Sequence, residues 1–196
     1  MTTELDPKQL SDVLDHSTED DGLSLEEKQE LKSFFTAPAA TDLPQQLTAE
    51  QESALAQEGS EPVDIRAQIS SMGLPGKIKL ALFGNSICRG LLVRDSNKLV
   101  QQFVMKNPKL QVREVEEFAR NPHISDQVLR LIADSKMWMK SALVKYNLVT
   151  NPKTPQDVAL KWLRYLQAHE VRRIAKSKNI PQIVTATAKK LVNDAQ

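Results

Sequence analysis

NPKTPQDVALKWLRYL, residues 151–166, is the stretch of sequence that decides the fold. Its second half carries apolar residues at the spacing of one helix face, namely Val158, Ala159, Trp162, Leu163 and Leu166. Pro152 prevents the preceding helix from continuing, and Pro155 stands near the first helical position, where its missing N–H costs nothing. Thr154 is predicted to cap the new helix, with Asp157 in the third helical position. The stretch therefore predicts one helix, a short turn and a second helix.

Similar joints occur along the rest of the chain. Three are Asn-Pro steps and one is a stretched version, namely Asn107-Pro108, Asn121-Pro122, Asn151-Pro152 and Asn179-Ile180-Pro181. Their intervals of 14, 30 and 28 residues are close to multiples of a helix plus a turn. Asn tolerates the left-handed conformation that ends many helices, and the following Pro blocks continuation, so we expect a helix end at each joint. Because Asn-Pro pairs end helices in any α-helical protein, the regular intervals are what favours a helical repeat.

Between these joints, apolar residues recur at helical spacing. The clearest faces are Leu99, Val100, Phe103 and Val104, then Val112, Val115 and Phe118, then Val128, Leu129 and Ile132. Residues 138–149 are predicted to form one longer helix, and Ser125 is predicted to cap the helix that it precedes. No segment shows sustained alternation of apolar and polar residues, so no strand is expected. The predicted fold class is all-α, a short stack of helical repeats that is α-solenoid-like.

The N-terminal part of the chain differs from the rest in charge. Residues 1–70 hold four basic and sixteen acidic residues, whereas residues 71–196 hold twenty-two basic and nine acidic ones. Ser24 and Glu27 form a capping box that starts a predicted helix. The few large apolar groups in this part cannot offset the ~1–2 kcal/mol of backbone entropy that each ordered residue loses. We therefore predict an acidic, largely disordered tail with transient helices over residues 1–62, followed by a basic helical-repeat domain over residues 63–196.

The sequence holds no arrangement of side chains typical of catalysis, metal binding or cofactor binding. Cys88 is the only cysteine, the histidines at 16, 123 and 169 are far apart, and the six glycines form no phosphate-binding loop. We therefore predict no catalytic, metal or cofactor-binding residues and expect that the protein is not an enzyme. No apolar stretch approaches the ~18 residues of a membrane span. Residues 1–6 lack the features of a secretory signal, so a cytoplasmic protein is expected.

Basic residues of the C-terminal part are the most informative polar feature. In a stack of similar helices, equivalent positions align, and cations on successive helices are expected to merge into one band. The predicted partner-binding residues are Lys136, Lys140, Lys145, Lys161, Arg164, Arg172, Arg173, Lys176, Lys178, Lys189 and Lys190. A solvated surface without a partner is the plain alternative for the same residues.

Four segments carry a resemblance to known proteins. Residues 76–85, 91–100, 151–155 and 175–179 resemble a group of uncharacterised bacterial α-helical repeat proteins. The repeats are also similar to HEAT-like and leucine-rich-repeat-variant units, over about residues 63–193. The resemblance implies an α-solenoid fold. It implies no activity, because the group has no assigned chemistry.

Together these features predict a non-catalytic interaction or scaffold protein that offers its basic surface to a protein partner. The alternative is sequence-tolerant binding of DNA or RNA by the same residues, because phosphate contacts give affinity without reading bases. The acidic residues 1–60 are expected to contact the basic domain and to compete with the external partner.

Overall fold

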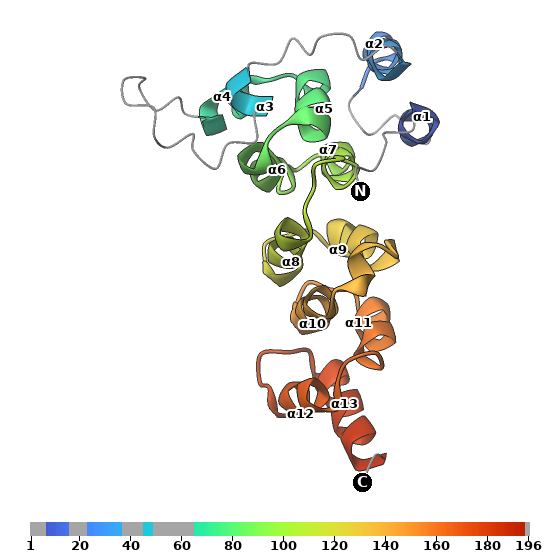
Figure 1. Cartoon of the computed structure of the whole chain (residues 1–196), viewed down its shortest axis with the longest axis vertical. Helices are drawn as coiled ribbons and strands as arrows, with labels where there is room; N and C mark the ends of the chain where they lie inside the picture. Colours follow the sequence, from blue (N-terminus) through green and yellow to red (C-terminus); the bar gives the residue numbers. More distant parts are fainter. Residues whose placement is uncertain (1–6, 16–22, 37–44, 49–64, 195–196) are drawn as a thin grey trace. The chain divides into compact units, whose positions relative to one another are not determined.

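The chain folds into helices wherever its structure is described. The computed structural model, drawn in Figure 1, describes residues 7–15, 23–36, 45–48 and 65–194. Every regular element in these ranges is a helix and none is a strand, so the predicted all-α fold is confirmed. The chain divides into two compact units, Met1–Leu110 and Gln111–Gln196. The predicted boundary between residues 62 and 63 lies outside the described residues and stays a prediction.

Short helices make up the first unit. They are α1 (Pro7–Asp15), α2 (Leu25–Thr36), α3 (Gln45–Thr48), α4 (Ile65–Ser71), α5 (Leu74–Phe83), α6 (Ser86–Leu92) and α7 (Lys98–Met105). Pro75 stands in the first turn of α5, and the side chains of Asn85 and Asn97 cap α6 and α7 by accepting backbone N–H bonds. α5 packs against α7. The fully buried residues of this pair include Ile78, Leu80, Leu82, Val100, Phe103 and Val104.

Side chains from two later segments close the end of α5. Asn107 Nδ2 donates to Ala81 O at 2.8 Å and to Gly84 O at 3.4 Å, and the buried Arg89 donates to Gly84 O at 2.9 Å. A Cβ atom at Gly84 would clash with the preceding helical turn and with Cys88. Glycine is therefore required at this close approach.

The described parts of the acidic N-terminal segment are helical. The predicted capping box at the start of α2 is present, because Glu27 N–H donates to Ser24 Oγ at 3.2 Å and Ser24 N–H donates to Glu27 Oε2 at 2.9 Å. These bonds from the backbone and hydroxyl of Ser24 lower the pKa of the Glu27 carboxyl. The capping box predicted from Ser24 and Glu27 is therefore confirmed.

Aromatic contacts attach α2 to α5 and α7 within the first unit. The rings of Phe34 and Phe83 lie edge to face with centroids 5.6 Å apart, and those of Phe35 and Phe103 are also 5.6 Å apart. Leu31 beside them is fully buried. The acidic segment is thus held by apolar burial as well as by charge.

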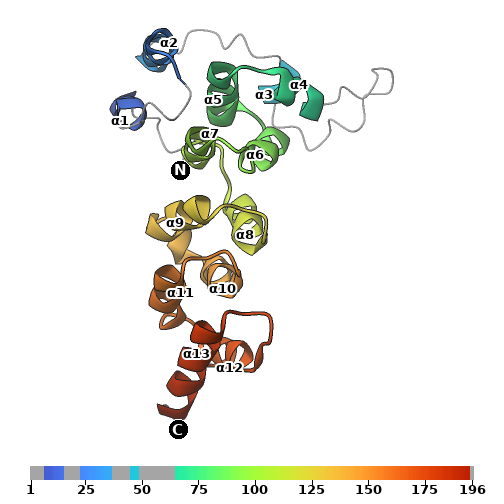
Figure 2. The same ribbon diagram turned by 180° about the vertical axis from the view of Figure 1, so that it is seen from behind.

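The second unit consists of successive helix pairs. Its elements are α8 (Val112–Arg120), α9 (Asp126–Asp134), the 3₁₀ helix η2 (Trp138–Lys140), α10 (Ala142–Thr150), α11 (Gln156–Leu163), α12 (Ala168–Lys176) and α13 (Gln182–Asp194). In Figure 1 and in the reverse view of Figure 2, α8, α10 and α12 follow one another along one side, and α9, α11 and α13 along the other. α10 packs against both α8 and α11, and α12 packs against α13.

One pattern recurs in the three pairs. Their first helices, α8, α10 and α12, are each nine residues long. The caps before and after these helices are Gln111 and Asn121, Ser141 and Asn151, and Gln167 and Ser177. The second helix then begins directly after residue 125, 155 or 181, so the turns 121–125, 151–155 and 177–181 have equal length. The pairs therefore share both helix length and connection.

Asn121 and Asn151 end their helices in an extended conformation, so the predicted left-handed conformation is wrong at these two joints. Asn121 has φ −76° and ψ 120°, and Asn151 has φ −75° and ψ 125°. The following proline is the cause, because its ring pushes the preceding residue into the extended region. The Asn side-chain oxygens instead accept a bond from the N–H two residues later, namely that of Lys109 at 2.8 Å, His123 at 2.9 Å and Lys153 at 2.9 Å.

Asn151 also ties its helix pair to the preceding one. Its Nδ2 donates to Ala119 O at 2.8 Å and to Asn121 O at 3.0 Å, at the end of α8. Asn151 is 3% exposed, so water cannot easily replace these bonds. Asn179 is exposed, and its side-chain amide donates to no described residue; only its backbone N–H donates, to Ser177 Oγ at 3.3 Å. The predicted fourth joint therefore lacks the tie.

Two further helix ends differ from the prediction and one agrees with it. The helix expected over residues 138–149 is two elements, because Ser141 caps a new helix, α10. Thr154 does not cap α11. It is buried and its hydroxyl donates to Leu148 O at 2.6 Å. Ser125 caps α9 as predicted.

Candidate binding surface

The predicted partner-binding residues all lie in the second unit, after α9. Lys136 and Lys140 belong to η2 and the turn before it, Lys145 to α10, Lys161 and Arg164 to α11 and its end, Arg172, Arg173, Lys176 and Lys178 to α12 and the turn after it, and Lys189 and Lys190 to α13. All are exposed except Lys145, which is half-buried. Lys136, Lys140 and Lys145 do not share one helix, because η2 and α10 are separate elements.

α12 carries the densest group of these cations. The residues that α12 buries are Val171, Ile174 and Ala175. With 3.6 residues per turn, Arg172, Arg173 and Lys176 lie on the opposite side of the helix. These three residues and Lys178 are called the α12 cationic face below. Two of them, Arg173 and Lys176, stand in the last helical turn, where the helix dipole favours positive charge.

Neighbouring carboxylates do not neutralise the α12 cationic face. Among the described residues, no Asp or Glu lies within ion-pair distance of its four side chains. Elsewhere in this unit Arg130 binds Asp157 through two hydrogen bonds, of 2.8 and 3.3 Å. That contact lowers the pKa of Asp157 and raises the pKa of Arg130. Arg130 is thus paired with a carboxylate, whereas no described carboxylate pairs with the cations of the α12 cationic face.

Aromatic rings accompany several of the cations. The Arg173 guanidinium lies 5.7 Å from the centroid of the Tyr146 ring, which stands on α10. Lys161 Nζ lies 5.3 Å from the Trp162 ring, and that ring contacts Tyr165 at 5.3 Å. Tyr165 is 66% exposed. Sequence reasoning did not single out Tyr165, although its position beside Arg164 is the signal of an amphipathic surface residue.

Equivalent positions on the first helices of the pairs do not carry equal charge. Counted back from the cap that ends each helix, Glu116 and Glu117 of α8 match Arg172 and Arg173 of α12. Lys145 of α10 matches two buried valines, Val115 of α8 and Val171 of α12. Residues 111–135 hold three basic and five acidic residues, whereas residues 136–194 hold twelve and three. Positive charge is thus concentrated in the last two pairs rather than repeated along α8, α10 and α12.

The remaining candidate groups for chemistry are scattered. Cys88 is buried in α6, as expected of a small apolar residue, and His123 and His169 are exposed. His16 lies outside the described residues. Within the described ranges, no three His, Cys, Asp or Glu side chains come together as metal ligands. No helix in those ranges is both long enough and apolar enough to cross a membrane.

Comparison of the chain with known protein families, curated proteins and solved structures finds no match. The resemblance to helical-repeat proteins therefore stays a prediction.

Proposed function

We propose that the protein is a non-catalytic binding protein whose last two helix pairs hold an acidic surface of a protein partner. The α12 cationic face carries this proposal. Its four cations lie exposed within seven residues and have no described carboxylate beside them. Like charges held together on a helix repel one another, and an anionic partner removes that repulsion on binding.

Exposed apolar side chains on the same unit favour a protein partner. Tyr165 is 66% exposed, Leu143 50% and Ile183 44%. Protein interfaces combine tyrosine, arginine and apolar groups at their centre with charges at the rim. The rim charges speed up association and select the partner, while the apolar groups supply much of the affinity.

The regular helix pairs support a repeat architecture for this unit. Equal helix lengths, equal turns and the Asn151 tie between pairs are typical of stacked repeats, in which each pair buries its face against its neighbours. Such stacks are rigid and present extended surfaces. A scaffold role for the protein is consistent with this arrangement.

Nucleic acid is the second candidate, and the unpaired cations favour it as well. Phosphate contacts by Lys and Arg release counterions, so the affinity would fall steeply as salt rises. Binding to a protein through exposed apolar side chains such as Tyr165, Leu143 and Ile183 depends less on salt. Salt dependence therefore separates the two candidates.

The test uses the full chain as bait and compares two matched variants. Arg172→Glu with Lys176→Glu reverses two charges on α12, and Arg113→Glu with Arg120→Glu reverses two exposed charges on α8. We expect the full chain to capture a protein that, once purified, forms a stoichiometric complex with it. The α12 variant should weaken that complex tenfold or more, because each charged contact contributes about 1.5–3 kcal/mol. The α8 variant should change affinity about threefold or less.

Three outcomes would contradict the proposal. Equal weakening by both variants would mean that charge in general, rather than the α12 cationic face, drives binding. Capture that is lost on nuclease treatment would favour the nucleic-acid candidate. Turnover of a substrate by the purified chain would contradict a non-catalytic role.

A regulatory role of the acidic segment is a related proposal. Glu30 of α2 pairs with Lys79 of α5 at 2.6 Å, so acidic helices contact basic ones within the first unit. Replacing the exposed Glu26 and Glu30 by Gln keeps the apolar contacts of α2 and lowers the negative charge. Affinity of the chain for a polyglutamate probe should then rise up to severalfold. Unchanged affinity would contradict competition by this segment.

A further inference from the structure

A cavity in the first unit is lined by residues that do not belong to the proposed partner surface. Its volume is about 230 Å³. The residues that line it are Arg66, Ile69, Ser70, Lys77, Leu91, Arg94 and Asp95, from α4, α5, α6 and the turn after α6. Drug-sized ligands occupy sites of roughly 300–1,000 Å³, so this cavity suits a smaller ligand.

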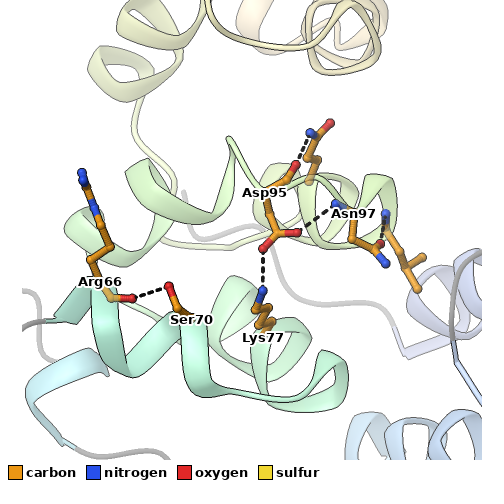
Figure 3. Close-up of polar contacts among 7 residues, drawn as sticks. Arg66, Ser70, Lys77, Asp95 and Asn97 are labelled. Atoms are coloured by element: carbon orange, nitrogen blue, oxygen red, sulfur yellow. Dashed lines mark hydrogen bonds and ion pairs between the residues drawn. The ribbon is translucent and has the colours of Figure 1, made fainter.

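An ordered ion pair forms one wall of the cavity. Asp95 Oδ2 accepts a bond from Lys77 Nζ at 2.9 Å, and Asp95 Oδ1 accepts one from Asn97 N–H at 2.8 Å. Gln101 Nε2 donates to the carbonyl oxygen of Asp95 at 2.6 Å. In Figure 3 the side chains of Lys77 and Asp95 point toward each other, while Arg66 and Ser70 stand on the neighbouring helix. Each carboxylate oxygen of Asp95 therefore accepts one bond, which fixes the position of the side chain.

Hydrogen-bond donors outnumber acceptors around this cavity. An ammonium group has three N–H donors, and Lys77 uses one of them on described residues although its side chain is only 22% exposed. A guanidinium has five donors, and no side-chain bond of Arg94 reaches a described residue. Both residues line the same cavity. The remaining N–H donors of Lys77 and Arg94 are therefore suited to binding an anion.

The other lining residues narrow the kind of anion. Ile69 and Leu91 supply an apolar wall, so the ligand needs an apolar stem behind its charged head. The negative charge of Asp95 opposes a dianion, and the planar fork of Arg94 matches a carboxylate with two parallel bonds. We propose that this cavity binds a carboxylate carried on a short aliphatic stem. The source is either a free small acid or a glutamate side chain of a peptide.

The test titrates the full chain, labelled with ¹⁵N, and follows the backbone amide signals of Lys77, Arg94 and Asp95. The probes are hexanoate, the blocked peptide acetyl-Gly-Glu-Gly-amide, hexanamide and inorganic phosphate. We expect saturable shifts with hexanoate, with the peptide, or with both, at concentrations up to about 10 mM. Saturation by hexanoate indicates a free acid, and saturation by the peptide alone indicates a protein side chain. Hexanamide, which lacks the charge, should produce no saturable shift.

A matched pair of variants separates the cavity from general charge. Arg94→Gln removes the guanidinium from the cavity and should weaken binding about tenfold, because a charged hydrogen bond is lost. Arg113→Gln removes an exposed cation of the second unit and should leave affinity unchanged. Both substituted residues are exposed, so the fold and its amide spectrum are expected to persist. The proposal is overturned if neither carboxylate probe saturates, if phosphate binds as tightly, or if both variants weaken binding equally.

Discussion

The two units share a helix joint and differ in how they hold positive charge. Asn107 in the first unit and Asn151 in the second each donate from a buried amide to the end of an earlier helix. Cations of the first unit face carboxylates, in the pairs Lys32–Asp15, Lys77–Asp95 and Lys79–Glu30. The α12 cationic face of the second unit has no described carboxylate near it. The same asparagine joint therefore occurs both in a unit whose cations pair with carboxylates and in a unit with cations that pair with no described carboxylate.

Composition explains the difference in charge. Residues 65–110 hold eight basic residues and one acidic residue, so this part of the first unit is as basic as the second unit. Residues 1–64 hold sixteen acidic residues, and α2 brings some of them against α5. Residues 1–110 together hold eleven basic and seventeen acidic residues, so the first unit supplies its own carboxylates. The second unit holds fifteen basic and eight acidic residues, so negative charge for the α12 cationic face has to come from outside that unit.

The largest expected effect concerns how α2 is held against α5 and α7 in the first unit. Phe35→Ala should lower the free energy of unfolding of this unit by about 3–4 kcal/mol, because a buried aromatic ring is removed. Leu25→Ala is the control, since Leu25 is on the same helix and 81% exposed, and should cost less than about 0.5 kcal/mol. Urea unfolding followed by far-ultraviolet circular dichroism measures both, and tryptophan fluorescence identifies the transition that belongs to the second unit. Equal losses would mean that α2 is not held by the ring contacts.

A smaller effect is expected from the joint in the second unit. Asn151→Ala leaves the buried carbonyl group of Ala119 without the Asn151 donor, and Asn121 O keeps only its bond from Ile124 N–H, so the change should cost about 2–3 kcal/mol. Trp138 and Trp162 are the only tryptophans, and both lie in the second unit, so tryptophan fluorescence reports its unfolding. The exposed Asn179→Ala is the control and should leave the transition in place. If both variants shifted the unfolding transition equally, the bonds of the buried Asn151 amide would not be the cause of the loss in stability.

Salt should raise the Tm of the second unit slightly and should not raise the Tm of the first. Sodium chloride screens the repulsion within the α12 cationic face, so the fluorescence-detected Tm of the second unit should rise by roughly 1–3 °C. It also screens the ion pairs of the first unit, where circular dichroism should show no such rise. Arg172→Gln with Lys176→Gln should abolish the rise in the second unit. A rise that persists in this variant would place the repulsion elsewhere.

The smallest effect concerns the pairing of Arg130 with Asp157. Arg130 lowers the pKa of Asp157 in the folded chain, so the unfolded chain binds a proton at this site more readily. The stabilisation is therefore present above about pH 4 and is lost as the pH falls through the lowered pKa. Asp157→Asn should flatten this part of the stability profile, measured by tryptophan fluorescence between about pH 2 and pH 6. Asp126→Asn is the control, and an equal flattening would contradict the assignment to Asp157.

Local chemistry explains which helix ends could be predicted from the sequence. Ser24 with Glu27, and Ser125, act within three residues of their own position, so their patterns predict the observed caps. The residues that differ from prediction act over a longer range. Thr154 bonds to Leu148 rather than capping α11, and the Asn151 amide reaches α8, thirty residues earlier at Asn121. Such partners are defined only once the helices have packed.

The candidate surfaces show the same limit. Exposure of Arg172 and Lys176 follows from their positions opposite the apolar stripe of α12, which the sequence displays. The density of charge on α12, opposite to that at matching positions of α8, could not be expected from an assumption of equal repeats. The cavity beside Lys77 and Asp95 was not predicted at all, because four separate segments contribute to it.

Asn121 and Asn151 begin turns of equal length thirty residues apart, and the Asn151 side-chain amide bonds to the carbonyl group of Asn121. A second copy of residues 121–150 inserted before residue 151 would begin and end with the same Asn-Pro turn. The asparagine at each boundary would then stand thirty residues after another asparagine, which is the spacing of the observed bond.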